Sequence, residues 1–467
     1  MGPRDKGLPM QTLNRTLIFV YLSVLIAASG IAQDWPQWRG NNRDAKATDF
    51  KAPKTWPKEL TKKWKVTVGD GVATPALVGD KLYVFARQDG NEVLRCLSAA
   101  DGKELWQEKY ESLGASGPAQ GFSGPRSSPT VIDGKVVTVG VRGVISCFDA
   151  ATGKKLWSKD DFKAWPNFFP SSSPIIVDGL VIAQLGGREN GSLVAYDLTS
   201  GEQKWKWTGD SPGYASPALM TVGGSKLIIA ETERRIVAVA AADGKLVWET
   251  PYSVQGRGYN ASTPLVDGQT LIYSGSGRGT KAVKIEKEGD KFVSKELWTT
   301  PDKSVQFNTP VLKNGLLYGL SGNNEFFCLN AQDGKLAWSA PGPGGGGMGP
   351  GGGPGAVPRP PAAGAIPGPD SPRPGGPGGP GGPGGPGGRR GGRGGGGGGY
   401  GSIVDAGSVL IALTPSSQLV VFEPTGKEYK QLATYKVADS PTHAYPVLSG
   451  NRIFIKDRDS LTLWIVD

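Results

Sequence analysis

The sequence predicts an all-β protein, an eight-bladed β-propeller with four short antiparallel strands in each blade. Three observations predict this fold. A motif that ends in Trp recurs along the chain, β-branched and aromatic runs alternate with Gly turns, and no segment of useful length shows helical periodicity. Successive motif Trp residues are separated by 40 to 51 residues, which is the length of one four-stranded blade.

Residues 1–32 are expected to form a signal peptide. Three basic residues precede an apolar run over residues 17–28, and small residues follow that run. This order is typical of a secretory signal. An uncleaved membrane anchor is the alternative, but the run is short for crossing a bilayer. We therefore expect a periplasmic or secreted protein with no transmembrane span after signal cleavage.

The predicted propeller occupies residues 60–467 and follows an N-terminal arm over residues 33–59. The eighth blade contains only three strands of its own. The lone strand predicted at residues 60–68 can supply the fourth strand and close the ring. Closure removes two unpaired strand edges that would otherwise favour aggregation.

The Trp of each repeat is expected to seal the seam between neighbouring blades, since an indole is a large and rigid apolar plate. In five clear copies a Gly stands four residues before the Trp and supplies the positive φ of a tight hairpin between strands three and four. The expected docking residues are Trp64, Trp106, Trp157, Trp205, Trp248, Trp298 and Trp338.

A Gly/Pro-rich tract over residues 341–399 separates the sixth and seventh predicted blades. Gly accounts for 30 of its 59 residues and Pro for 15, so the tract is expected to be a disordered insertion. The formal net charge is +10, but outside the signal and the tract the chain has 44 Lys+Arg against 40 Asp+Glu. This nearly balanced charge does not predict a nucleic-acid partner.

The repeat Phe148-Asp-Ala-Ala-Thr-Gly-Lys-Lys-Leu-Trp157 resembles the tryptophan-docking motif of PQQ-repeat propellers, and the resemblance covers nearly all of the chain after residue 60. The segment Asp34-Trp-Pro-Gln-Trp-Arg-Gly40 resembles the opening of exported bacterial members. The resemblance implies one of two function classes. PQQ-dependent dehydrogenases are enzymes, whereas propellers of the BamB type bind protein partners and carry no cofactor.

In the dehydrogenases, the resemblance implies a quinone stacked between a Trp and a disulfide of adjacent cysteines, beside a Ca²⁺ ion held by Glu, Asn and Asp. The three cysteines, Cys96, Cys147 and Cys328, are not adjacent, and each lies six residues before a motif Gly. Ala stands at the same position in two other blades, which predicts three free, buried thiols. No metal-ligand spacing or phosphate loop is present. The sequence therefore predicts no catalytic or metal-binding residue and no cofactor, and PQQ stays an open alternative.

A ligand is expected at the mouth of the axial funnel, which the loops entering each inner strand surround. The connections between blades are expected to be short, apart from the Gly/Pro tract. Aromatic, amide and Arg side chains at this mouth would suit a small anionic ligand or an extended peptide. The candidates are Arg126, Tyr214, Arg257, Tyr259, Asn260, Gln306, Phe307, Asn308 and His443.

Six arginines stand in the turns between second and third strands on the same face. Acidic residues accompany them, and we interpret them as solvated hairpin tips in preference to ligand-binding groups. They are Arg87, Arg142, Arg188, Arg234, Arg278 and Arg458.

These observations predict a monomeric, non-catalytic, exported propeller that acts as a binding or protein-assembly scaffold in the cell envelope. Whether the protein is an enzyme is left open. One alternative is a PQQ-dependent alcohol or sugar dehydrogenase, and another is a module that binds envelope glycans.

Overall fold

The computed structural model describes residues 1–2, 33–254, 258–343 and 399–467. Residues 3–32 of the expected signal peptide, Arg257 and residues 344–398 of the Gly/Pro tract lie outside the described residues.

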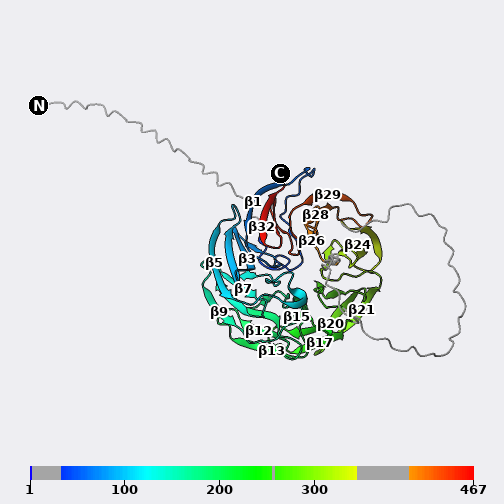
Figure 1. The fold of residues 1–467 in the computed structure, drawn as a ribbon. Helices are drawn as coiled ribbons and strands as arrows, with labels where there is room; N and C mark the ends of the chain where they lie inside the picture. Colours follow the sequence, from blue (N-terminus) through cyan, green and yellow to red (C-terminus); the bar gives the residue numbers. More distant parts are fainter. Residues whose placement is uncertain (3–32, 255–257, 344–398) are drawn as a thin grey trace, which may run out of the picture.

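Eight four-stranded antiparallel sheets follow one another around a ring, as Figure 1 shows by the progression of colour. This arrangement confirms the predicted propeller. The first four blades are β2(Ala76–Val78), β3(Lys81–Gln88), β4(Asn91–Ser98) and β5(Glu104–Glu111); β6(Thr130–Ile132), β7(Lys135–Val139), β8(Ile145–Asp149) and β9(Lys155–Lys159); β10(Ile175–Val177), β11(Leu180–Leu185), β12(Ser192–Asp197) and β13(Gln203–Trp207); β14(Ala218–Val222), β15(Ser225–Glu231), β16(Arg235–Ala240) and β17(Leu246–Pro251).

The next three blades complete the consecutive part of the ring. They are β18(Leu265–Asp267), β19(Thr270–Ser274), β20(Thr280–Glu288) and β21(Lys291–Thr300); β22(Val311–Lys313), β23(Leu316–Leu320), β24(Glu325–Asn330) and β25(Leu336–Pro341); β26(Ser402–Asp405), β27(Leu410–Leu413), β28(Gln418–Phe422) and β29(Gln431–Lys436).

The eighth blade joins the two ends of the folded chain. It contains β30(Val447–Ser449), β31(Arg452–Lys456) and β32(Ser460–Ile465), and its outermost strand is β1(Thr61–Thr67). β1 pairs antiparallel with β32 from Thr61 opposite Ile465 to Thr67 opposite Ser460, and Figure 1 shows the blue strand beside the red one. The predicted closure of the ring by the N-terminal strand is confirmed.

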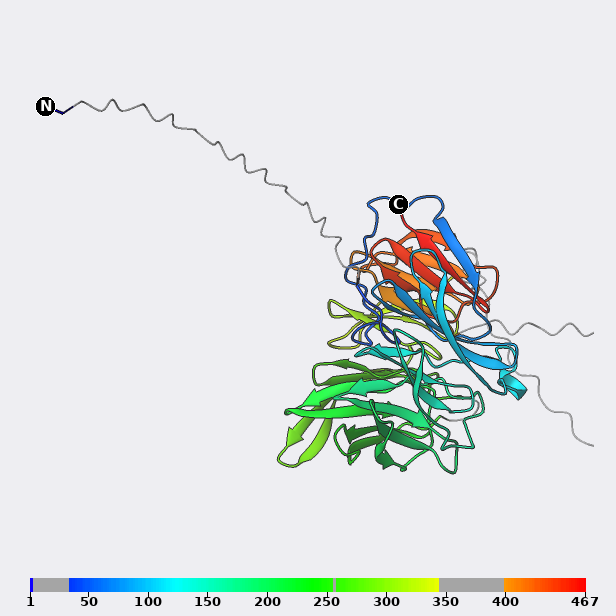
Figure 2. The same ribbon diagram turned by 90° about the vertical axis from the view of Figure 1, so that its left-hand side faces the viewer.

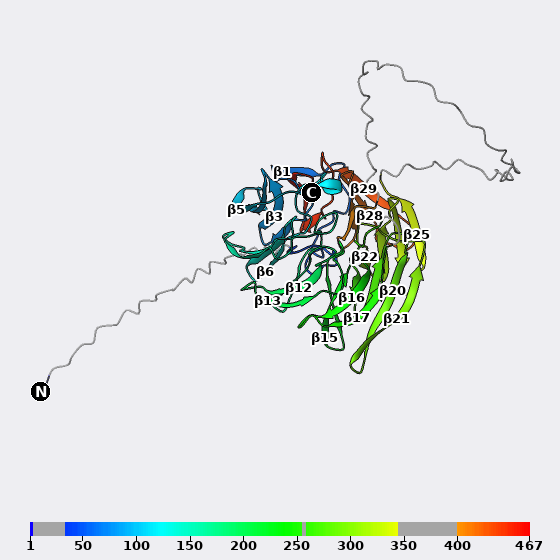
Figure 3. The same cartoon turned by 60° about the horizontal axis from the view of Figure 1, so that its bottom comes forward.

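The fifth blade has the longest hairpin. β20 and β21 pair over nine positions because the turn of its stretched repeat lies farther out, and Figure 3 shows both strands on the outer side of the ring. Within the described ranges the only helix is the 3₁₀ turn η1(Gly117–Ala119), and none there is long and apolar enough to cross a membrane.

Five motif Trp residues pack against the motif Gly of the next blade. The indole nitrogen of Trp157 donates a hydrogen bond to the Leu198 carbonyl oxygen of the next blade, at 3.0 Å. The ring lies against Gly201, whose φ is +69°, and a Cβ atom there would lie 2.7 Å from the indole. The same contact recurs at Gly102 with Trp64, Gly153 with Trp106, Gly244 with Trp205, and Gly334 with Trp298.

The remaining two expected docking residues lie in other surroundings. Trp338 donates to the Thr425 carbonyl oxygen at 2.7 Å, in the blade beyond the Gly/Pro tract. Trp248 is buried in the apolar cluster between the fourth and fifth blades.

A small residue stands opposite the Trp on the third strand of each motif blade. Cys96 pairs with Trp106, Cys147 with Trp157 and Cys328 with Trp338, and the strand register shifts directly after each pair. The third strand is buried between two blades at this point, so a small apolar side chain fits where a larger one would not. All three cysteines are buried and free, as predicted.

Candidate ligand-binding site on the propeller axis

A cavity of about 730 Å³ lies on the propeller axis. This volume is within the range of small-molecule sites. Its described lining contains nine aromatic or imidazole side chains, one Arg, several hydroxyls and no Asp, Glu or Lys. Of the sequence-predicted candidates, the structure brings together Arg126, Tyr214, Tyr259, Phe307, Asn308 and His443.

Two connections between blades are longer than predicted. Residues 112–129 join β5 to β6, and residues 160–174 join β9 to β10. The expectation of uniformly short connections was therefore wrong for these two. They add Phe122 and Phe168 to the cavity, which the repeat pattern could not reveal because these segments lie outside the repeat.

Arg126 holds the first of these connections in place. Its guanidinium donates to the carbonyl oxygens of Ala119 at 3.0 Å, Phe122 at 2.8 Å and Gly124 at 3.0 Å. Burial lowers the pKa of Arg126. A guanidinium stays protonated in proteins, so Arg126 supplies a positive charge at the cavity wall.

The cavity walls consist of two aromatic groups. Phe168 lies 5.0 Å from Tyr259, and Tyr214 lies 5.6 Å from Tyr259, measured between ring centroids. In the second group, Phe307 stacks on Tyr400 at 4.4 Å. Aromatic faces on two sides of a cavity favour a ligand with flat apolar surfaces.

His443 completes the second aromatic group. Its ring lies 4.8 Å from Phe122 and 5.2 Å from Tyr400, both edge-on. Burial lowers the pKa of His443 to about 4, because an apolar environment disfavours the charged imidazolium. The imidazole is therefore neutral at neutral pH and contributes no charge to the cavity.

Two predicted candidates lie beside the cavity without lining it. The Asn260 amide donates to the carbonyl oxygens of Thr232 and Tyr252 and is 3% exposed, so it fastens two connections together. Gln306 approaches Gly322 and Gly399. Asn308 lines the cavity, yet its amide nitrogen also donates to a backbone oxygen, that of Leu320, at 2.7 Å.

A ring of hydroxyls surrounds the axis, and the sequence interpretation missed its role. In six blades a Ser or Thr precedes the Pro that opens the first strand, and each hydroxyl oxygen accepts the backbone N–H of the corresponding residue in the preceding blade. The donor–acceptor distances are 2.9 to 3.1 Å. We call these residues the hydroxyl ring: Thr74, Ser128, Ser173, Ser216, Thr263 and Thr309.

The N-terminal arm forms the floor of the cavity. Arg39 is fully buried and donates to the Thr309 and Pro310 carbonyl oxygens of the sixth blade, at 2.9 and 2.8 Å. Arg43 donates to the Ser173 and Pro174 carbonyl oxygens of the third blade, at 3.1 and 3.0 Å. The arm thus crosses the axis between the third and sixth blades.

The floor and the mouth lie on opposite faces of the ring. Trp38 of the arm lines the cavity, and so do Pro118 and Ala119 of η1. Figure 2 shows the ring from its side, with the dark-blue arm on one face and the cyan 3₁₀ turn on the other. The cavity is therefore closed by the arm and opens toward the face that carries η1.

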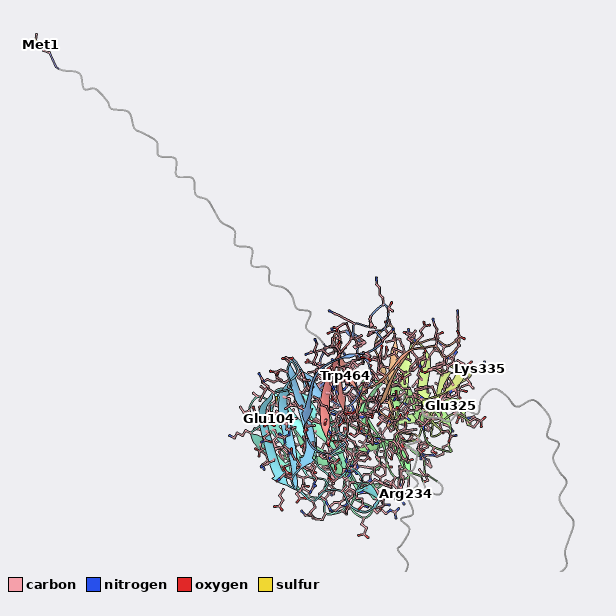
Figure 4. The ribbon with its side chains drawn as sticks, turned by 45° about the horizontal axis from the view of Figure 1, so that its top comes forward. Met1, Glu104, Arg234, Glu325, Lys335 and Trp464 are labelled. Carbon is pink, nitrogen blue, oxygen red and sulfur yellow. The ribbon has the colours of Figure 1, made fainter. Side chains whose placement is uncertain are left out.

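The six outer arginines mostly fasten neighbouring turns. Arg142 donates to the carbonyl oxygens of Leu113 and Gly114, and Arg278 donates to that of Tyr252 at 2.8 Å. Arg234, which is labelled in Figure 4, donates to the buried carboxylate of Asp210 at 2.9 Å. These contacts support the interpretation of the outer arginines as parts of the hairpin tips.

A sequence profile of the family described as outer membrane protein assembly factor BamB matches residues 52–208 and 90–340. The chain belongs to this BamB-type PQQ-repeat family.

Curated relatives include both function classes that the repeat implied. The BamB protein of Xanthomonas campestris pv. campestris is 26% identical over 256 residues, which are 51% of this chain and 60% of that protein. The BamB protein of Yersinia pestis is 24% identical over 60% of each chain. A quinohemoprotein alcohol dehydrogenase of Comamonas testosteroni is 27% identical over 139 residues, 29% of this chain and 19% of that enzyme. The chain spans about 60% of the length of the BamB relatives it matches first.

Solved structures of both classes share the fold. The crystal structure of BamB from Moraxella catarrhalis superposes with a TM-score of 0.57 at 13% identity, over 87% of this chain and 98% of that one. A europium-containing methanol dehydrogenase superposes with a TM-score of 0.59 at 14% identity, over 92% and 89% of the two chains.

The described cavity does not fit the quinone and calcium pair that the dehydrogenase resemblance implies. Ca²⁺ binds oxygen ligands that usually include carboxylates, and the lining offers Asn308 but no described Asp or Glu. Among the described residues no group of three or more His, Cys, Asp or Glu side chains could hold a metal ion. The three cysteines, Cys96, Cys147 and Cys328, lie in three different blades. They therefore do not form the disulfide of adjacent cysteines that the dehydrogenase resemblance implies.

Proposed function

We propose that this protein is an exported, non-catalytic scaffold that supports assembly of outer-membrane proteins in the cell envelope. The observation that carries the proposal is the BamB family match, which extends from residue 52 to residue 340. BamB relatives from several bacteria support the same class.

The ring gives such a scaffold a rigid frame. At six seams an indole nitrogen donates to a carbonyl oxygen of the next blade, and the N-terminal strand closes the last blade. The fourth strand of every blade lies at the outer rim, where a partner segment could pair with its free edge. We propose that a protein partner in the envelope uses this rim, and that the propeller acts as a monomer.

A gene deletion in the source organism tests the assembly function. We expect the fraction of folded outer-membrane β-barrel proteins, measured by heat-dependent mobility on gels, to fall in the deletion strain and to recover when the full chain is restored. An unchanged folded fraction would refute the scaffold function.

Export through residues 1–32 is a separate part of the proposal. Fractionation should place the mature protein in the periplasm, and N-terminal sequencing should find a start close to Gln33. A protein found in the cytoplasm with an intact N-terminus would contradict export.

A PQQ-dependent dehydrogenase is the second candidate, and the quinohemoprotein relatives favour it. Equilibrium dialysis with PQQ and Ca²⁺, followed by dye-linked oxidation of alcohols and sugars, separates the two. Saturable PQQ binding with turnover would replace the scaffold proposal with this enzyme.

A further inference from the structure

The hydroxyl ring presents unused hydrogen-bond donors to the cavity. Each hydroxyl oxygen of the ring accepts one backbone N–H, which leaves its own hydrogen to donate. Five of the six hydroxyl residues line the cavity, all except Ser173. Within the described ranges, the protein itself provides no acceptor for these five hydroxyl hydrogens.

Three arginines lie at or behind the cavity wall. Arg126 lines the cavity, and Arg39 and Arg43 lie behind its floor, next to the ring of Trp38. None of the three forms an ion pair with a described residue. Burial and the neighbouring Arg39 lower the pKa of Arg43 to about 9, which leaves it charged at neutral pH. Buried charge without a counter-ion is costly, so an anion entering the cavity would be stabilised.

The negative charge of Asp70 opposes the lowering of the Arg126 pKa, but this carboxylate also has other partners. It accepts hydrogen bonds from the Ser123 backbone nitrogen and hydroxyl, both at 2.6 Å, and it lies 3.8 Å from the Arg458 guanidinium. Asp70 therefore acts on both Arg126 and Arg458, and this one carboxylate does not balance the charges of Arg39, Arg43 and Arg126 together. A bound anion would offset the remaining positive charge.

The aromatic walls and the hydroxyl ring would contact different parts of one ligand. Flat C–H faces of sugar rings pack against aromatic faces such as Tyr259 and Tyr400, and sugar oxygens accept from hydroxyl donors. A purely apolar ligand would leave the donors unpaired, which is unfavourable in a buried site. Because Trp38 and the rest of the arm close the floor, a long chain can enter only by its end.

We propose that the axial cavity binds the end of an acidic saccharide, with its carboxylate at the hydroxyl ring and its sugar faces between the aromatic walls. This inference goes beyond the scaffold function and does not require it.

Isothermal titration of the full chain with digalacturonate tests the ligand class. We expect saturable binding of digalacturonate and binding of its neutral methyl ester that is at least about tenfold weaker, because the ester lacks the charge that offsets the arginines. Absence of saturable binding, equal affinity for the ester, or displacement of digalacturonate by PQQ at lower concentration would each overturn the proposal.

Three Ser→Ala variants test where in the cavity the ligand binds. Ser128→Ala and Ser216→Ala each remove a lining hydroxyl, whereas Ser173→Ala removes a hydroxyl of the same ring that does not line the cavity. All three lose one acceptor of a backbone N–H, so their melting temperatures should fall by similar amounts. Digalacturonate affinity should fall about three- to tenfold in the first two variants and stay unchanged in the third. Equal affinity in all three would refute binding at the hydroxyl ring, and normal outer-membrane protein folding in these strains would leave the scaffold function standing.

Discussion

Replacing Gly201 with Ala should destabilise the propeller by pushing Trp157 out of its seam. Gly201 has a φ of +69°, and the added Cβ would lie 2.7 Å from the indole. Carbon atoms in good contact are about 3.5 to 4.0 Å apart, so the ring or the turn must move by about 1 Å. Such a shift would strain or break the hydrogen bond from Trp157 to the Leu198 carbonyl oxygen.

The matched control is Gly134→Ala. Gly134 has a φ of +68°, and no atom lies within 4 Å of its added Cβ. Both variants place Ala in the left-handed region, which costs about 1 kcal/mol. Only Gly201→Ala adds overpacking and a lost hydrogen bond, together about 2 to 4 kcal/mol. The difference between the two variants therefore isolates the contact with Trp157.

Guanidinium chloride unfolding, followed by intrinsic fluorescence, measures this difference as a free energy, or as an unfolding rate where refolding fails. In a Trp157→Ala background, Gly201→Ala and Gly134→Ala should cost about the same. If the two glycine variants already behave alike in the wild-type background, the indole does not determine the need for Gly at this turn.

Three further predictions concern buried groups and closure. Burial raises the pKa of Glu231 well above its usual value. The folded state therefore keeps a proton that the unfolded state releases, and the free energy of unfolding falls as the pH rises above about 4.5. Glu231→Gln should remove this loss, which is measured by comparing unfolding free energies at pH 5 and pH 8. Burial raises the pKa of Cys96 to about 11 and that of Cys147 to about 12, so the native protein should resist thiol reagents. The denatured, unreduced protein should show three thiols by titration. A count of one thiol would reveal a disulfide. Deletion of residues 33–68 removes β1 and the arm and should yield an insoluble or poorly folded product, whereas a monomeric product that melts cooperatively would show that the other strands close the ring alone.

The blade count and the closing strand were predictable because they depend on local patterns. A Gly four residues before a Trp fixes a hairpin and its outer strand, and a short final blade requires a strand from elsewhere. The small residue opposite each Trp was also visible, since Cys96, Cys147 and Cys328 occupy the position that Ala195 holds in another blade.

The cavity was predictable only in part. The loops that enter the inner strands carry Tyr214, Tyr259 and His443, and all three line the cavity. Phe122 and Phe168 were missed because they stand in longer connections without a repeat. The Ser or Thr before each inner-strand Pro was visible in the sequence, but its acceptor role joins residues about one blade apart and appears only when the ring is assembled.

Closing the ring and building the cavity are coupled through the same stretch of chain. Arg39 and Arg43 lie in the arm directly before β1, and their contacts join the third and sixth blades across the axis. A ring that opened between β1 and β32 would loosen the arm, which would then be held only by its contacts with the other blades, among them those of Arg39 and Arg43. A ligand that binds the floor must in turn stabilise the closed ring, because binding to only one of two states shifts the equilibrium toward it. The seam between the first and last strands is therefore the place where ligand binding and the stability of the propeller would affect each other.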